Sequence, residues 1–174
     1  MFPVLRRAFV VASATWAALL VIVPLLMSRP HASAPVTALV VAVYGIGSLV
    51  CHQLAERSYR LWSAQMPVCA RCTGIYFGAA ASSILFSVAH HVRQKPSRDG
   101  AAARARANVA RRLEPGVGAA RAVIGVAALP TAATLVYEWS SGVTPTNAVR
   151  FAAGLPIGVA VAWLIVSAAT DQVN

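Results

Sequence analysis

The sequence predicts an all-α integral membrane protein, a helical bundle in which residues 1–174 form a single transmembrane domain. Hydrophobic residues make up 58% of the chain and charged residues only 11%, whereas a soluble domain carries roughly a quarter charged residues. The apolar residues are gathered in segments of about twenty, the length that crosses a hydrocarbon core of roughly 30 Å. We therefore expect about five transmembrane helices, with four as the alternative, in a multi-pass protein of the cell membrane.

The first two apolar segments cover about Ala8–Met27 and Ala34–Cys51. The first follows two arginines and precedes a triplet of small residues, as the core of a secretory signal peptide would. Its apolar stretch is longer than that of most signal peptides, and Pro35 would come directly after the cleavage site. An uncleaved transmembrane helix is therefore the prediction.

Three further spans are predicted over about Cys72–His90, Ala119–Tyr137 and Ala148–Ala169. Gly74 and Gly78, near the start of the third span, have the small-xxx-small spacing that lets a neighbouring helix approach closely. Pro130 lies inside the fourth span, where it kinks or locally opens the helix. The pattern indicates close helix packing without indicating which helix is the partner.

Residues 92–118 form a basic loop, rich in arginine and alanine, between the third and fourth spans. The net charge of +10 would suggest nucleic acid as a partner of a soluble protein. No aromatic residues alternate with these arginines, so we expect no nucleic-acid partner. Basic loops of membrane proteins face anionic lipid headgroups, and we expect the bilayer and those headgroups as partners. Within the loop, a short helix capped by Asp99 and a solvated loop stay open as alternatives.

Charge also predicts an orientation. Alternation through five spans places the segment between the second and third spans on the side of the chain start, opposite the basic loop. If the basic loop is cytoplasmic, that segment and the amino terminus face outward, and Asn174 is cytoplasmic. The arginines of the chain start and of that segment oppose this assignment.

All three cysteines lie at the boundary between the second and third spans. Cys51 ends the second span and precedes His52, whereas Cys69 and Cys72 form a CxxC pair at the start of the third. This spacing allows both sulfurs to chelate one metal ion or to close a small disulfide. Amides at a helix N-terminus also stabilise thiolates. The intervening residues 53–68 are long enough to bring both groups to one membrane face.

Three hypotheses follow from this grouping. Cys51, His52, Cys69 and Cys72 can form a Cys₃His site for a transition metal, with zinc as the first choice and copper(I) or an iron–sulfur centre as alternatives. In the second hypothesis the protein is a thiol–disulfide oxidoreductase, in which Cys69 and Cys72 cycle between dithiol and disulfide, Cys51 acts as a relay thiol, and a quinone accepts the electrons. In the third, the chain is a structural or assembly subunit. Whether it is an enzyme stays open.

The helix geometry separates another pair of imidazoles from this site. At 1.5 Å per residue, Cys72 and His90 stand on the order of 27 Å apart along one span. His90 and His91 are therefore expected at the opposite membrane face.

Several polar residues are expected on the cysteine side: Gln53, Glu56, Arg57, Arg71, Glu138, Asn147 and Arg150. Ionisable groups close to a membrane interior are candidates for function. Glu138 is a candidate partner of His52 or a proton acceptor, and Arg150 a candidate anchor for an anion or carboxylate. For Glu56 and Arg57, pairing with each other at headgroup level is the alternative. No glycine-rich phosphate loop or Ser-His-Asp set favours a kinase or hydrolase.

The motifs also resemble those of a known family. Cys51-His52-Gln53, Glu56-Arg57-Ser58-Tyr59 and Pro67–Tyr76 with Gly78 are similar to the signature of an uncharacterised family of polytopic membrane proteins, the domain of unknown function 2085. The resemblance covers roughly Val36 to Leu164 and includes Asn147, Arg150, Gly154 and Gly158 in the closing segment. The family usually carries an Asp-Gly-like pair and a glutamine before that segment, where this chain has Tyr137-Glu138-Trp139-Ser140. The resemblance implies a shared site at the cysteine motifs and no particular activity.

Overall fold

The computed structural model describes residues 2–29, 33–93 and 117–171. In this part of the chain, five α-helices are α1 (Phe2–Met27), α2 (Ala34–Val50), α3 (Ala70–Arg93), α5 (Val117–Ser141) and α6 (Asn147–Asp171). Between α2 and α3 lie a short 3₁₀ helix, η1 (Ala55–Arg57), and a two-stranded hairpin of β1 (Arg60–Leu61) and β2 (Ala64–Gln65). Most of the predicted basic loop, including Asp99, lies outside the described residues.

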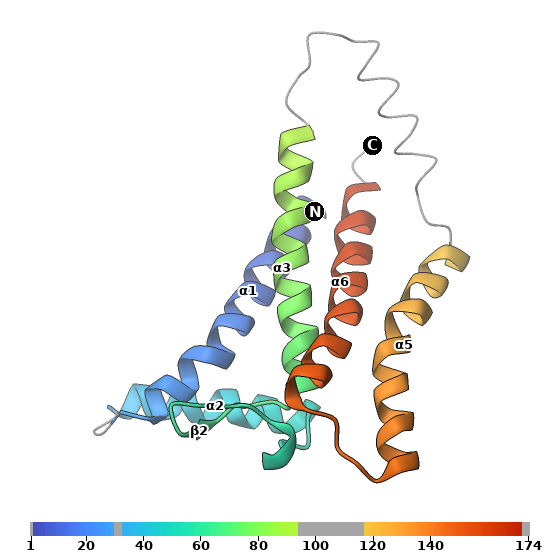
Figure 1. Cartoon of the computed structure of the whole chain (residues 1–174). Coiled ribbons are helices and arrows are strands. Elements are labelled where there is room, and N and C mark those ends of the chain that lie inside the picture. Colours follow the sequence, from blue (N-terminus) through green and yellow to red (C-terminus); the bar gives the residue numbers. More distant parts are fainter. Residues whose placement is uncertain (1, 30–32, 94–116, 172–174) are drawn as a thin grey trace, which may run out of the picture.

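Four of the described helices, α1, α3, α5 and α6, are long and apolar enough to cross a membrane. Helices α3 and α6 run side by side, α5 lies beside α6 at a greater separation, and α1 diverges from α3 toward the end where α2 lies (Figure 1). This confirms the prediction of an all-α membrane bundle. The count agrees with the alternative of four spans.

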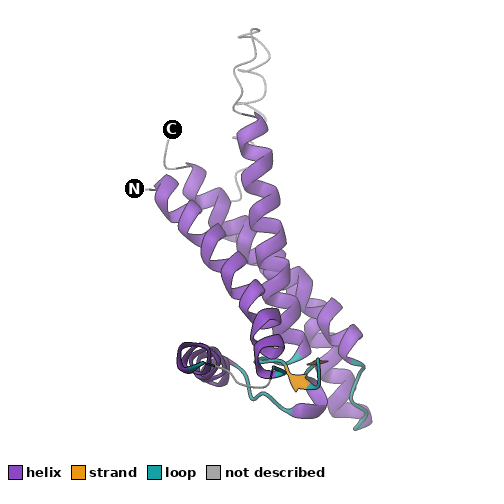
Figure 2. Ribbon diagram, turned by 90° about the vertical axis from the view of Figure 1, so that its left-hand side faces the viewer, coloured by secondary structure: helices purple, strands orange, loops and turns teal. Residues whose placement is uncertain are grey.

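The second predicted span does not cross the bundle. Helix α2 has 17 residues and lies across the ends of the long helices, so that the view of Figure 2 is along its axis. At 1.5 Å per residue its length is about 25 Å, short of the roughly 30 Å that a span needs. An apolar helix too short to span fits an interfacial or re-entrant segment.

The position of α2 reverses the predicted side of the amino terminus. Only one long helix, α1, precedes the cysteine segment. The start of α1 and the end of α6 therefore lie at one end of the molecule, together with the end of α3 and the start of α5 (Figure 1). The cysteine segment lies at the other end. The expectation that the amino terminus shares the cysteine side is therefore wrong, because it rested on a second span.

Helices α3 and α6 pack through glycines on both sides of their interface. The pair Gly74 and Gly78 on α3 faces the pair Gly154 and Gly158 on α6. A Cβ atom at any of the four would collide with a backbone carbonyl oxygen of the facing helix, at Phe151, Leu155, Arg71 and Ile75 respectively. The small-xxx-small prediction is confirmed, and its partner is α6.

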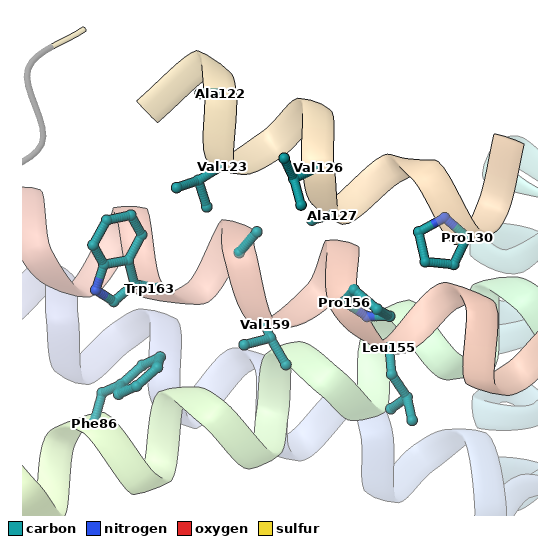
Figure 3. A pocket seen from close by; sticks show the side chains of 11 residues that line it. Phe86, Ala122, Val123, Val126, Ala127, Pro130, Leu155, Pro156, Val159 and Trp163 are labelled. Atoms are coloured by element: carbon teal, nitrogen blue, oxygen red, sulfur yellow. The ribbon is translucent and has the colours of Figure 1, made fainter. Parts of the chain in front are cut away.

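Helix α5 packs mainly on α6 and leaves an open apolar groove beside it (Figure 3). The groove has a volume of about 850 Å³. Its lining comes from three helices: Phe86 of α3, Ala122, Val123, Val126, Ala127 and Pro130 of α5, and Leu155, Pro156, Val159, Ala160 and Trp163 of α6. The groove lies along the part of the bundle that is apolar enough for the membrane interior.

Candidate metal centre

The cysteines meet where the end of α2 approaches the start of α3. Cys51 follows the last residue of α2 in an extended conformation, and its N–H donates to the carbonyl of Gly47 at 2.9 Å. Cys69 directly precedes α3, and its carbonyl accepts from the N–H and the hydroxyl of Thr73 at 2.9 and 3.1 Å. Cys72 lies in the first turn of α3. Two helix ends thus position three thiols.

The three sulfur atoms lie within 4.8 Å of one another. All three cysteines are free thiols and partly buried. The N–H of Cys69 donates to Sγ of Cys51 at 3.2 Å. Hydrogen bonds from the thiols of Cys69 and Cys72, together with backbone N–H groups, lower the pKa of the Cys51 thiol below its usual range. The cluster therefore stabilises a thiolate at Cys51.

This geometry fits a soft metal ion. Zinc–sulfur bonds of about 2.3 Å in a tetrahedral site place the sulfurs roughly 3.8 Å apart. Three sulfurs within 4.8 Å need only small side-chain adjustments to reach that spacing. Thiolate ligands favour zinc, copper(I) or iron over magnesium or calcium.

His52 does not join the group of three sulfurs among the described residues. Its side chain is exposed, and it lines a cavity that the cysteines also line. The reason is local: Cys51 has φ of −147° and ψ of 139°, and successive side chains of an extended chain point to opposite sides. Three of the four expected ligands therefore come together.

Gln53 ties the end of α2 to the segment before Cys69. Its Nε2 donates to the carbonyls of Tyr44 at 2.9 Å and Pro67 at 2.6 Å. Gln65 in turn donates to the Gln53 carbonyl at 2.6 Å. Gly47 makes the contact possible, because a Cβ there would meet the Pro67 carbonyl oxygen and Nε2 of Gln53. Sequence reasoning placed Gln53 near the site but missed Gly47, whose signal was a glycine one turn before a cysteine.

An apolar base supports the thiols. Leu20 of α1, Met66 and Val68 form a buried cluster, and Cys51 and Cys72 pack against it. Because protein interiors are closely packed, this base restricts the rotamers of both cysteines.

An ion-pair network adjoins the thiols, and we call its three basic members, Arg57, Arg71 and Arg150, the arginine cluster. All three surround the carboxylate of Glu138, which is only 7% exposed. Oε1 of Glu138 lies 2.7 Å from Nη2 of Arg57 and 2.8 Å from Nη2 of Arg150. Nη2 of Arg71 lies 3.9 Å from Oε2 and donates to the Thr134 hydroxyl at 3.1 Å. The network joins the loop after α2 to α3, α5 and α6.

The network changes the roles expected for several residues. Arg57 pairs with Glu138, so the alternative that pairs it with Glu56 is not what the structure has, and Glu56 is exposed. Asn147 donates from Nδ2 to the Ser58 carbonyl at 3.1 Å and ties the start of α6 to the loop. The carboxylate of Glu138 has guanidinium groups as partners. These ion pairs and the Asn147 hydrogen bond connect the loop after α2 to α5 and α6 at the cysteine end of the bundle.

Thiols and guanidinium groups line one cavity of about 340 Å³. Its walls comprise Val50, Cys51, His52, Gln53, Leu54, Arg57, Cys69, Arg71, Cys72 and Arg150. With three arginines and one carboxylate beside it, the surroundings of this cavity are positively charged. His90 is near the other end of α3, as the helix rise predicts.

The fold and this site define an integral membrane protein with a bundle of four long helices and a thiol-rich centre at one end. The chain belongs to the family described as "Predicted membrane protein (DUF2085)", whose model matches residues 51–164. That match begins at the first cysteine and extends into α6, so it includes the cysteines, the arginine cluster and the paired glycines. The resemblance inferred from the motifs is thereby confirmed.

A curated relative matches a shorter part of the chain. It is an uncharacterized protein, MJ1492, of Methanocaldococcus jannaschii, with 41% identity over 46 residues. The matched segment covers 26% of this chain and 30% of the relative, so the likeness extends over less than a third of either protein. No solved structure matches the chain significantly.

Proposed function

We propose that this membrane protein binds a transition metal ion through Cys51, Cys69 and Cys72, with zinc as the first candidate. The observation that supports this is the convergence of three free thiols within 4.8 Å from two segments of the chain. A site with three protein ligands leaves a fourth position for solvent, for a substrate, or for His52 after a side-chain rotation. When bound, such an ion supplies Lewis-acid chemistry at that open position.

The surroundings of the thiols support metal binding electrostatically. Metal ligation requires deprotonated cysteines, and the lowered pKa of Cys51 provides a thiolate in advance of binding. The positive arginine cluster on the same cavity favours the negative charge that three thiolates bring. A small shift in side-chain position then completes the site.

Metal content is the direct test. Full-length protein purified without chelators is expected to carry about one zinc, copper or iron ion per chain, measured by elemental mass spectrometry. Cys51→Ser, Cys69→Ser and Cys72→Ser are each expected to reduce the content to background, because two thiols rarely retain an ion.

Arg60→Gln is the matched control, since Arg60 is exposed on the hairpin and lies outside the cavity lining. It should retain the metal. Content well below one ion per chain that no cysteine substitution changes would contradict the proposal.

Thiol–disulfide exchange is the second candidate, favoured by the closeness of the Cys51 thiolate to both other sulfurs. Oxidation would join Sγ of Cys69 and Cys72, releasing two electrons and two protons to a quinone, and attack by Cys51 would exchange the bond. Alkylation with a mass-tagged reagent in intact cells separates the candidates: a disulfide fraction favours exchange, and fully reduced thiols favour metal binding.

If loss of all three cysteines alters neither folding, metal content nor phenotype, the structural-subunit hypothesis gains support.

We infer that the cysteine end faces away from the cytoplasm. Ten of the 15 basic residues belong to the start of α1 or to the sequence from the end of α3 to the second turn of α5. These are Arg6, Arg7, Arg93, Lys95, Arg98, Arg104, Arg106, Arg111, Arg112 and Arg121. The cysteine end has Arg29, Arg57, Arg60, Arg71 and Arg150, and three of these surround Glu138. Positive charge is enriched on the cytoplasmic side of membrane proteins.

We predict that both termini are cytoplasmic. A reporter that works only in the cytoplasm should be active when fused to either terminus, and a reporter that works only outside the cytoplasm should be inactive. A membrane-impermeant thiol reagent added to intact cells should label the cysteines, and not a Cys51→Ser/Cys69→Ser/Cys72→Ser variant. A periplasmic or extracellular signal from the carboxyl-terminal fusion would reverse the orientation. An outward site in an oxidising compartment would strengthen the exchange candidate.

A further inference from the structure

The arginine cluster has more positive charge than its surroundings balance. Three guanidinium groups, which stay protonated at any physiological pH, share the single carboxylate of Glu138. Arg150 is 1% exposed and the side chain of Arg71 16% exposed, so water screens neither of them well. Buried charge without a counter-charge is costly. Within these four residues, three positive charges face one carboxylate, an excess of two before the Cys51 thiolate on the same cavity is counted.

The same arginines also have unused hydrogen-bond donors. Within the described part of the chain, Nε and Nη1 of Arg150 and the Nε atoms of Arg57 and Arg71 have no hydrogen-bond partner, and among acceptors of the cluster only Oε2 of Glu138 has none. All three side chains line the cavity of about 340 Å³. Arginine side chains present donors in a planar fork that matches the oxygens of phosphate and carboxylate groups. A bound oxyanion would neutralise part of the positive charge of the arginines and accept hydrogen bonds from their unpaired N–H groups.

The cavity has the size and the helix geometry that such a ligand needs. Its volume lies at the small end of the range for ligand sites, roughly 300–1,000 Å³. Cys69 and Cys72, at the N-terminal end of the 24-residue α3, line it too. Free N–H groups and the helix dipole at such an end favour an anion.

We propose that this cavity binds a phosphate-type oxyanion through Arg57, Arg71 and Arg150, beside the thiols and independently of any metal. Two sources share this chemistry: dissolved phosphate and the phosphate of a lipid headgroup. The carboxylate of Glu138 orients the three guanidinium groups and at the same time weakens the anion's binding by repulsion. The three cysteines lie on the same cavity walls, and their replacement tests whether anion binding depends on them.

Binding is measured on the full-length protein in a phosphate-free maltoside detergent, at constant ionic strength. Inorganic phosphate is titrated by calorimetry, and phosphatidylglycerol in mixed micelles is titrated separately. Saturable binding of phosphate identifies the dissolved ion as a ligand, and binding of phosphatidylglycerol alone identifies the headgroup. Failure of both to bind the wild-type protein would overturn the proposal.

Variants assign the binding to the cluster. Arg57→Gln is expected to fold, because its side chain is 40% exposed, and to weaken binding at least about tenfold through loss of a charge-assisted contact. Arg150→Gln should abolish binding, whereas Glu138→Gln should tighten it. Arg60→Gln, the same chemical change on the neighbouring hairpin, should leave it unchanged.

The triple variant Cys51→Ser/Cys69→Ser/Cys72→Ser separates this site from the metal proposal. It should lose any metal and still bind the anion at least as tightly as the wild type. Equal weakening by Arg57→Gln and Arg60→Gln, or loss of anion binding in the triple variant, would assign the anion to another place and refute the arginine site. Metal content and anion affinity are measured independently, so either proposal can fail alone.

Discussion

Glu138→Ala is expected to lower the free energy of unfolding by about 3–5 kcal/mol, the largest effect of any single substitution considered for this chain. The carboxylate lies among three guanidinium groups, two of them within 2.8 Å of Oε1. Its removal leaves the almost fully buried Arg150 beside Arg57 and Arg71 with no opposite charge. Because the four residues come from the loop and from α3, α5 and α6, their repulsion acts on the whole polar end of the bundle.

Thermal unfolding in detergent measures the effect, and a midpoint on the order of 10 °C lower is expected. Glu56→Ala is the control, since Glu56 lies at the same end of the bundle and is exposed. Its effect on the free energy of unfolding should stay within about 0.5 kcal/mol. Equal shifts for the two variants would show that Glu138 does not hold the cluster together. Added phosphate should restore part of the lost stability of Glu138→Ala if the anion site exists.

Gly158→Ala is expected to destabilise the bundle by about 1–3 kcal/mol, and the double variant Gly154→Ala/Gly158→Ala by more. The new methyl groups would collide with the backbone carbonyl oxygens of Ile75 and Arg71 on α3. A backbone cannot rotate away as a side chain can, so the two helices must separate. Separation would also move Arg150 of α6 away from Arg71 of α3.

Gly125→Ala on α5 is the matched control, because nothing lies within 4 Å of a Cβ at that position. The same chemical change there should be neutral or stabilise by up to about 1 kcal/mol, through the better helix propensity of alanine. Unfolding in detergent and the metal content of each variant are the measurements. If Gly158→Ala is as stable as Gly125→Ala, the close approach of α3 and α6 is not required.

The metal and anion proposals place two chemistries on one cavity. Cys51, Cys69 and Cys72 supply soft ligands, and Arg57, Arg71 and Arg150 supply charge and directed donors on the same walls. A bound anion beside an open metal position is the arrangement in which a metal could act on an anionic substrate.

Much of this site could be predicted because its signals are local. A run of about twenty apolar residues crosses a bilayer whatever its neighbours are, which is why α1, α3, α5 and α6 were expected. The rise of a helix separates Cys72 from His90 without knowledge of the fold. Alternation between membrane faces then brought Glu138, Asn147 and Arg150 to the cysteine end.

Other features depended on contacts between distant segments. A 17-residue apolar helix such as α2 has the composition of a span. In its position across the bundle, Gln53 and Gly47 contact Pro67, which is distant in the sequence. The side of the amino terminus changed with it. His52 turned away from its neighbour Cys51 because of one extended residue, which composition does not encode.

Hydropathy and spacing alone therefore determined the membrane class, the long helices and the common location of the cysteines, since each depends on residues close together in the chain. The tertiary structure decided which partner each group has. Gly74 and Gly78 pack on α6, and Glu138 binds arginines from three other segments. The physical reason is that backbone contact and charge neutralisation depend on distances in space, which only the packed helices specify.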